Sequence, residues 1–335
     1  MSSSSRRSRI VGAVLLAMAL VACSTPPAPE SESRPIVGPD GAGLFGGAGS
    51  PWFQRVPAGA SVDPRSAEYV ARMLAEIPLV SVNGWTVPVY EADSATPRYP
   101  VTATEDYVPG GWTLPAVPIP DAAAPDPKED GHMVVVDRSA GCVYEFWQAR
   151  RLGAGWTASW VNATPADGTG VYPDGLSARA SGFSAAAGLI WPQELAAGRI
   201  NHALVFAYPF SRDSGPVPPA TKSDGRSDGA ALPMGTRLRL DPSIDVESLG
   251  LAPEQVTIAR AMQEYGLILA DSGGGFTLFA AAPQSYATFP YPSSWTRDTW
   301  ANISAIPFNA LQVLQPTEPV DRYSGPQVTN RCAAT

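Results

Sequence analysis

His132-Met133-Val134-Val135-Val136-Asp137 and, after four intervening residues, Cys142-Val143-Tyr144-Glu145-Phe146-Trp147 are the runs that decide the fold. Both are rich in β-branched and aromatic residues, and short runs of this composition between turn residues predict β-strands. Runs at 156–161, 202–208 and 235–240 have the same character. We therefore expect a mainly β protein, a β-sandwich or jelly-roll-like domain with a few peripheral helices.

Two helices are expected beside these strands. Residues 63–77 have an amphipathic pattern, with Asp63 as the N-cap and Pro64 in the first turn. Residues 253–265 begin with a proline and end just before Gly266, which is typical of a helix with a C-terminal glycine stop.

Glycine and proline define the remaining organisation. The segments 267–270 and 276–280, joined by the glycine-rich 272–275, predict a hairpin. Proline recurs every few residues from position 78 onward, so we expect residues 51–127 to wrap the core or cover a cleft. Residues 128–335 would then form the β-sandwich domain. No internal repeat and no glycine motif for a dinucleotide or phosphate is present.

The N-terminus has the pattern of an export signal. Three arginines precede an apolar run at 10–19, which leads into Leu20-Val21-Ala22-Cys23. This segment resembles a bacterial lipoprotein signal with its lipobox, which implies removal of residues 1–22 and lipidation of Cys23. The apolar run is shorter than the roughly 20 residues that span a bilayer. The resemblance predicts a lipid-anchored protein on the extracytoplasmic face of the cell membrane.

The composition fits an exported protein. Residues 23–50 are rich in Pro, Gly and Ser and are expected to be a disordered tether. Charged residues make up only 16% of the chain, against about 25% in ordinary soluble domains. The net charge is −8, and loss of Arg6, Arg7 and Arg9 with the signal makes it −11. This charge disfavours nucleic acid as a partner.

Two cysteines, Cys142 and Cys332, remain after lipidation of the third. An exported compartment permits them to form a disulfide, but sequence does not supply the Cα separation that the bond requires. The pairing stays open at this point. A thiol enzyme is disfavoured because alternation places Cys142 toward the core.

The candidate catalytic residues are His132, Glu145, His202 and Asp130. The chain has only two histidines, and each opens an expected strand beside a polar neighbour. Alternation along 142–147 places Glu145 on the same face as Trp147. A carboxylate beside an indole suits a sugar-binding cleft, since the ring covers the apolar face of a pyranose and the acid provides acid/base catalysis.

The candidate substrate-binding residues are Trp147, Asp174, Arg237 and Asp271. Arg237 can bind a substrate carboxylate in a bidentate manner, although a solvated sheet face also explains it. Trp156 and Trp160 share a face and could extend the aromatic platform. Taken singly, each of these residues also has an ordinary structural explanation, and their clustering carries the hypothesis.

Several of these residues fall in a pattern similar to one that recurs in secreted bacterial proteins. It includes Asp130 to Asp137, Cys142 to Glu145, Gly198 to Leu204 and Tyr265 to Asp271, and covers roughly residues 128–285. The resemblance implies no particular reaction. It does imply that Asp130, His132, Glu145, His202 and Asp271 belong to one unit.

The sequence therefore predicts an extracytoplasmic lipoprotein that acts on polysaccharide as a glycoside hydrolase or lyase. In a hydrolase Glu145 would pair with Asp130 or Asp174, and in a lyase His132 or His202 would be the base. No cofactor or metal is expected. The alternatives are a non-catalytic glycan-binding or envelope-assembly lipoprotein, and a protein-docking role for the proline-rich part.

Two sharper alternatives have less support. Residues 182–186 are similar to a nucleophile elbow of serine hydrolases, but the final glycine of that motif is missing. A zinc site could use His132, Glu145 and His202, but no helical His-x-x-x-His spacing supports it.

Overall fold

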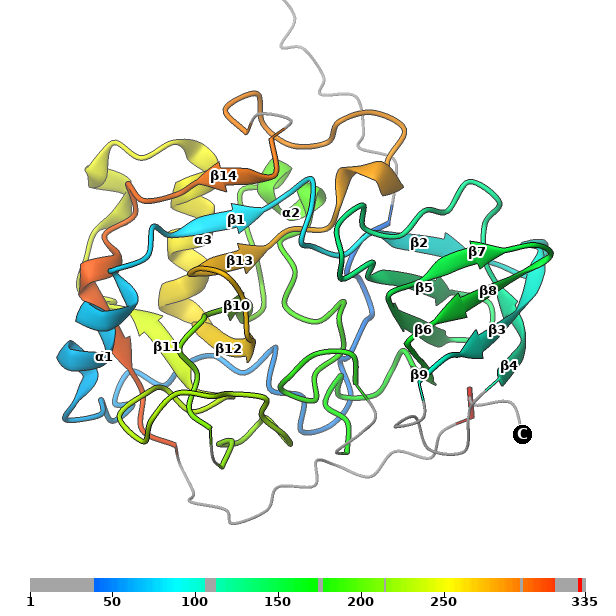
Figure 1. Cartoon of the computed structure of the whole chain (residues 1–335). Coiled ribbons are helices and arrows are strands. Elements are labelled where there is room, and N and C mark those ends of the chain that lie inside the picture. The colour runs from blue at the N-terminus through cyan, green and yellow to red at the C-terminus, as the bar shows by residue number, and fades with distance from the viewer. Residues whose placement is uncertain are drawn as a thin grey trace, which may run out of the picture. The chain divides into compact units, whose positions relative to one another are not determined.

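The computed structural model describes residues 39–105, 113–173, 177–213, 215–295, 298–316 and 331–332. Within these residues, fifteen strands form three sheets and only three α-helices are present (Figure 1). The expectation of a mainly β, β-sandwich-like protein with few helices is confirmed. The predicted signal, Cys23 and most of the predicted tether lie outside the described residues.

The largest sheet has the order β14 (Trp300–Asn302), β1 (Leu79–Ser81), β13 (Thr277–Phe279), β10 (Leu204–Ala207), β12 (Leu267–Asp271), β11 (Arg237–Leu240) and β15 (Leu311–Val313). All four residues of β10 are buried, as expected for a central strand covered on both faces. It pairs parallel to β12 and antiparallel to β13. The predicted hairpin of 267–270 with 276–280 is therefore wrong, because the more deeply buried β10 lies between these two strands.

Two four-stranded sheets complete the β structure. One has the order β2 (Val89–Ala92), β5 (Met133–Asp137), β6 (Cys142–Trp147) and β9 (Trp160–Pro165), and the other has the order β4 (Thr113–Pro118), β3 (Arg98–Ala103), β8 (Gly155–Ala158) and β7 (Arg150–Leu152). The strand expected at 156–161 is divided between β8 and β9, which belong to different sheets. Strands β1 to β4 all come from the proline-rich part of the chain. Each of the three sheets contains at least one of them.

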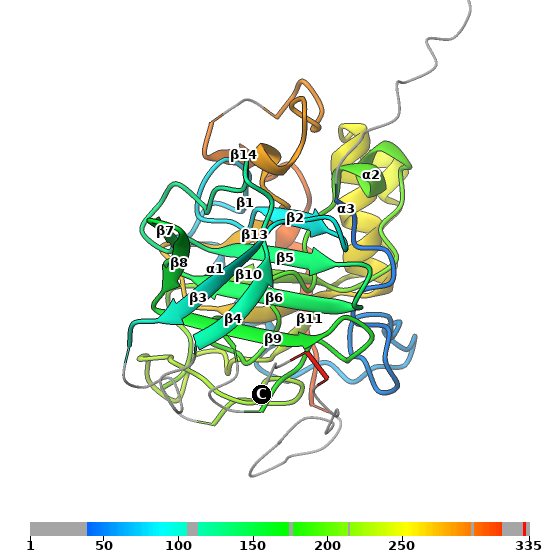
Figure 2. The ribbon, with the colours of Figure 1, turned by 90° about the vertical axis from the view of Figure 1, so that its right-hand side faces the viewer.

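Alternation along β6 gives its sheet a hydrophobic core on each face. Val143 belongs to the core shared with the seven-stranded sheet, whereas Phe146 belongs to the core shared with β3 and β8. Figure 2 shows β3 and β4 crossing over β5 and β6. The sheet of β5 and β6 is thus the middle layer, and both of its faces are covered.

The helices are α1 (Ser66–Met73), α2 (Pro192–Ala196) and α3 (Pro253–Glu264), with 3₁₀ turns at Val246–Leu249, Pro283–Ser285 and Phe308–Ala310. The predicted helix at 253–265 is confirmed, and Gly266 follows it with a φ of +81°. The other helix starts at Ser66, two residues later than expected. The residues before it form a turn, in which the Asp63 carbonyl accepts the Ser66 N–H at 2.8 Å and Asp63 Oδ1 accepts the Arg65 N–H at 2.7 Å. None of the helices in the described ranges is long and apolar enough to span a membrane.

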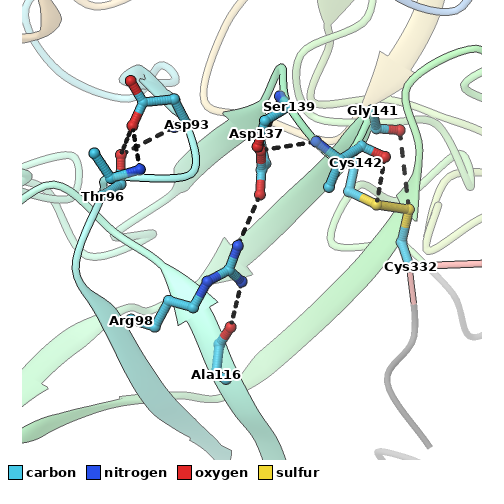
Figure 3. Close-up of polar contacts among 11 residues, drawn as sticks. Asp93, Thr96, Arg98, Ala116, Asp137, Ser139, Gly141, Cys142 and Cys332 are labelled. Atoms are coloured by element: carbon cyan, nitrogen blue, oxygen red, sulfur yellow. Dashed lines mark hydrogen bonds and ion pairs between the residues drawn. A yellow bond between two sulfur atoms is a disulfide. The ribbon is translucent and has the colours of Figure 1, made fainter.

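Cys142 and Cys332 form a disulfide with a Cα separation of 5.7 Å (Figure 3). Beside it, the buried carboxylate of Asp137 ends β5. Its Oδ1 accepts the N–H groups of Ser139 and Ala140, both at 3.0 Å, and its Oδ2 accepts from the Arg98 guanidinium at 3.3 Å. These contacts tie the middle sheet to β3.

Candidate functional site

A cavity of about 600 Å³ brings together three of the predicted site residues, Asp130, His132 and Asp271. Asp130 and His132 lie just before β5, and Asp271 ends β12. Residues of β1 and β13 and the glycine-rich segment 272–275 complete this side of the wall. A concave site with a few converging polar groups is the usual form of a ligand-binding site.

Aromatic and aliphatic side chains form much of the rest of the wall. Trp85, Phe279 and Trp300 line the cavity, together with Ile77 and Leu79. Trp300 is 46% exposed and Ile77 is 62% exposed. Exposed apolar groups around a cavity mark a binding surface more often than a structural one.

Trp85 is held in an unusual backbone conformation. Its φ of +55° is rarely adopted by a bulky side chain. The buried carboxylate of Asp126 accepts the N–H of Trp85 at 3.1 Å, of Thr86 at 3.2 Å and of Lys128 at 2.9 Å. Left-handed backbone of this kind persists only where the surroundings hold it, and it gathers at binding and active sites.

Asp130 and Asp271, two of the three carboxyl groups that line the cavity, are partly withdrawn from water. Asp271 Oδ1 accepts the N–H of Ala180 at 3.3 Å and of Ser272 at 3.1 Å, and burial raises the pKa of Asp271 to about 7. Burial also raises the pKa of Asp130, whose Oδ1 lies 3.5 Å from the indole nitrogen of Trp147. The charge of Asp130 contributes to the raised pKa of Asp271. The two carboxyl groups therefore act on each other electrostatically.

Arg179 lines the cavity although it is only 1% exposed. Its Nη2 donates to the Ala185 carbonyl at 2.7 Å, and its guanidinium lies 4.7 Å from the ring centre of Phe279. Its Nη1 is buried and has no hydrogen-bond partner among the residues that the structure describes. Burial lowers the pKa of Arg179, while the carboxylates of Asp271 and Glu145 oppose that effect. Arg179 is not among the site residues predicted from the sequence.

His132 is neutral at physiological pH. Burial, helped by the charge of Arg179, lowers the pKa of His132 to about 3. Its Nε2 is buried, and none of the described residues forms a hydrogen bond with it. A neutral imidazole there can accept or donate one hydrogen bond to a ligand, but it is a weak base.

Glu145 does not line the cavity. The predicted alternation is right, because Val143 on the same face packs in the core between β6 and the seven-stranded sheet. That face is covered, however, and Glu145 is 1% exposed. Its Oε1 accepts the Ser184 hydroxyl and, at 2.7 Å, the Ala185 N–H, and burial raises the pKa of Glu145 to about 7. It therefore acts on the cavity only through Arg179.

His202 lies at a different place in the fold. Its Nδ1 is 2.9 Å from the Ala203 carbonyl and its Nε2 is 3.1 Å from the Glu194 carboxylate at α2. Both partners are acceptors, which fits a doubly protonated ring. Burial lowers the pKa of His202, but Glu194 and the Ala203 carbonyl outweigh it and the pKa is raised. The structure does not bring His202 together with His132.

Four more of the residues singled out from the sequence do not line the cavity: Trp147, Trp156, Trp160 and Arg237. Arg237 is largely buried, and burial lowers its pKa to about 10; it donates to the carbonyls of Pro51 and Gln54. Trp156 and Trp160 are buried and form no exposed platform. Asp174 lies outside the described residues. Among the residues described, no three His, Cys, Asp or Glu side chains are grouped so as to hold a metal ion.

No protein-family model, curated protein or solved structure matches this chain. The cavity geometry and the sequence features are therefore the basis for a functional conclusion.

Proposed function

We propose that the protein is an extracytoplasmic, lipid-anchored protein that acts on polysaccharide in the cavity lined by Asp130, His132 and Asp271. The observation that carries the proposal is a single cavity whose wall holds the carboxyl groups of Asp130 and Asp271 together with the indoles of Trp85 and Trp300. Indole rings provide flat apolar surfaces for the faces of pyranose rings, and carboxyl groups bind hydroxyls or exchange protons.

The state of the carboxyl groups favours hydrolysis over elimination. With its pKa raised to about 7, Asp271 holds a proton in a large part of the molecules at neutral pH and is suited to be the general acid. Asp130, which lines the same cavity, is the general base or nucleophile. A lyase would need His132 as its base, and a pKa of about 3 makes that imidazole a poor one.

The proposed location has two supports. The N-terminal pattern resembles a lipoprotein signal with Cys23 as the lipidated residue. The Cys142–Cys332 disulfide fits an oxidising compartment outside the cytoplasm. In this proposal the partners are the membrane, through the lipid, and a cell-wall or environmental glycan.

The test is a panel of polysaccharides incubated with the full-length protein in detergent, with reducing ends and unsaturated products measured together. New reducing ends without unsaturated products are expected. In the variant Asp271→Asn, turnover should fall by about 100-fold or more, with retained binding and melting temperature. Asp213→Asn is a matched control, because Asp213 is exposed and does not line the cavity. Full activity in Asp271→Asn contradicts the assignment of the general acid.

A second candidate function is glycan binding without turnover. The predominance of Ile77, Leu79, Trp85, Phe279 and Trp300 in the wall favours it, since these groups supply affinity and no chemistry. Retention of the wild-type protein on a glycan, with no product over hours, distinguishes this function from hydrolysis.

A further inference from the structure

The wall of the cavity carries more negative than positive charge. Its ionisable groups are the carboxyls of Glu76, Asp130 and Asp271 and the guanidinium of Arg179, in addition to the neutral His132. The positive charge of Arg179 is shared with Glu145, which lies outside the cavity. A ligand inside the cavity therefore meets an excess of carboxylate.

Neighbouring groups increase this excess. Ser272, which lines the cavity, donates its hydroxyl to the carboxylate of Asp224 at 2.7 Å. The charge of Asp224 adds to the raised pKa of Asp271. Glu76 makes no side-chain hydrogen bond or ion pair with any of the described residues. Arg179 is the one lysine or arginine among the described residues that line the cavity.

The aromatic groups fit the same kind of ligand. Trp85 and Trp300 line the cavity, and the face of an indole attracts an organic ammonium more strongly than any other aromatic side chain. The buried Nη1 of Arg179 is an unused donor, and it requires an oxygen acceptor. The ligand thus needs a positive charge, an apolar face and a neutral oxygen in one small ring.

We propose that the sugar recognised in this cavity carries a free, protonated amino group, as in a glucosamine residue without its acetyl group. This inference rests on the proposed function and specifies its substrate class. The ammonium lies among the carboxylates, a ring face lies against an indole, and a hydroxyl accepts from Arg179. A uronic acid would satisfy Arg179 equally well, but its carboxylate would be repelled by those of Glu76 and Asp130, and by Asp271 in the molecules where that group is ionised.

The experiment compares three tetrasaccharides by titration calorimetry with the full-length protein in detergent: β-1,4-linked glucosamine, its fully N-acetylated form, and a uronate. We expect the free-amine form to bind about tenfold or more tightly than the acetylated form, because a hydrogen-bonded ion pair is lost on acetylation. Its binding should also weaken as salt is added.

Variants locate the effect in the cavity. Glu76→Gln should weaken binding of the free-amine form several-fold and leave binding of the acetylated form unchanged. Glu105→Gln is the matched control, since Glu105 is exposed and lies outside the cavity. Equal binding of the free-amine and acetylated forms, or tighter binding of the uronate, overturns the inference and leaves the proposed function standing. Absence of binding by all three, and by every glycan of the panel, overturns both.

Discussion

Replacement of Glu145 by glutamine should make the protein more stable at alkaline pH. Glu145 is buried beside Arg179, and burial raises its pKa from 4.5 to about 7. Each pKa unit corresponds to 1.36 kcal/mol, so ionisation of Glu145 costs the folded state about 3 kcal/mol. Glutamine keeps an oxygen for the Ser184 hydroxyl and the Ala185 N–H and carries no charge.

The sign follows from proton binding. Because the folded state holds the Glu145 proton more tightly than the unfolded state, the contribution of Glu145 to wild-type stability falls as pH rises from about 4.5 to about 7 and is then constant. The raised pKa values of Asp271 and His202 act in the same direction, but they cancel in the difference between variant and wild type. We expect near-equal stability at pH 5 and an advantage of about 3 kcal/mol for Glu145→Gln at pH 8.5.

Urea unfolding followed by tryptophan fluorescence at pH 5, 7 and 8.5 measures this difference. Glu105→Gln, an exposed change of the same chemistry, should show no such dependence on pH. The reasoning is refuted if Glu145→Gln is less stable than wild type by a similar amount at every pH. That result would mean that the attraction between Glu145 and Arg179 outweighs burial. Glycan turnover should survive the substitution, because Glu145 does not line the cavity.

Two further predictions concern the framework of the site. Asp126→Asn should lower stability by about 2 kcal/mol and weaken glycan binding, because asparagine has one side-chain oxygen and no charge. All three backbone N–H groups then lose a charged acceptor, one of them loses its acceptor altogether, and the left-handed turn is held less firmly. Unchanged affinity in calorimetry would show that the turn does not position the ligand. Double replacement of Cys142 and Cys332 by serine should lower stability by about 2–5 kcal/mol through release of the chain entropy held by the disulfide; an unaltered melting temperature would contradict this.

Predictions from the sequence were most accurate for features that depend on a single strand, such as its position and the face on which each residue lies. The runs at 132–137 and 142–147 form β5 and β6, and alternation assigned Val143 and Phe146 to opposite faces. Alternation cannot say whether a face is exposed, and here a second layer covers each one. The face of β6 that carries Glu145 was therefore predicted correctly, but the burial of that face was not.

Residues whose position depends on distant parts of the chain could not be found in this way. Arg179 lies in a loop, and its place in the cavity depends on Asp271, 92 residues further on, and on the Phe279 ring. The left-handed backbone conformation of Trp85 depends on the Asp126 carboxylate, which accepts its N–H. A tryptophan directly after a glycine, within a segment rich in turn residues, was the only local signal for a specially held side chain.

The strand order of the seven-stranded sheet also explains where the cavity lies. Residues 272–275 were expected to be a tight turn between adjacent strands, but β10 occupies the place between β12 and β13. Because β10 and β12 run parallel, both end at the same edge, and the chain leaving Asp271 must cross over the end of β10 to reach β13. At Gly273 a Cβ atom would lie 2.9 Å from that of Ala207, so the crossing requires glycine opposite a small residue. Ala207, Asp271 and the crossing segment all line the cavity. The glycine-rich segment 272–275 thus allows the chain to cross close to the end of β10. This close crossing places Asp271 in the wall of the cavity.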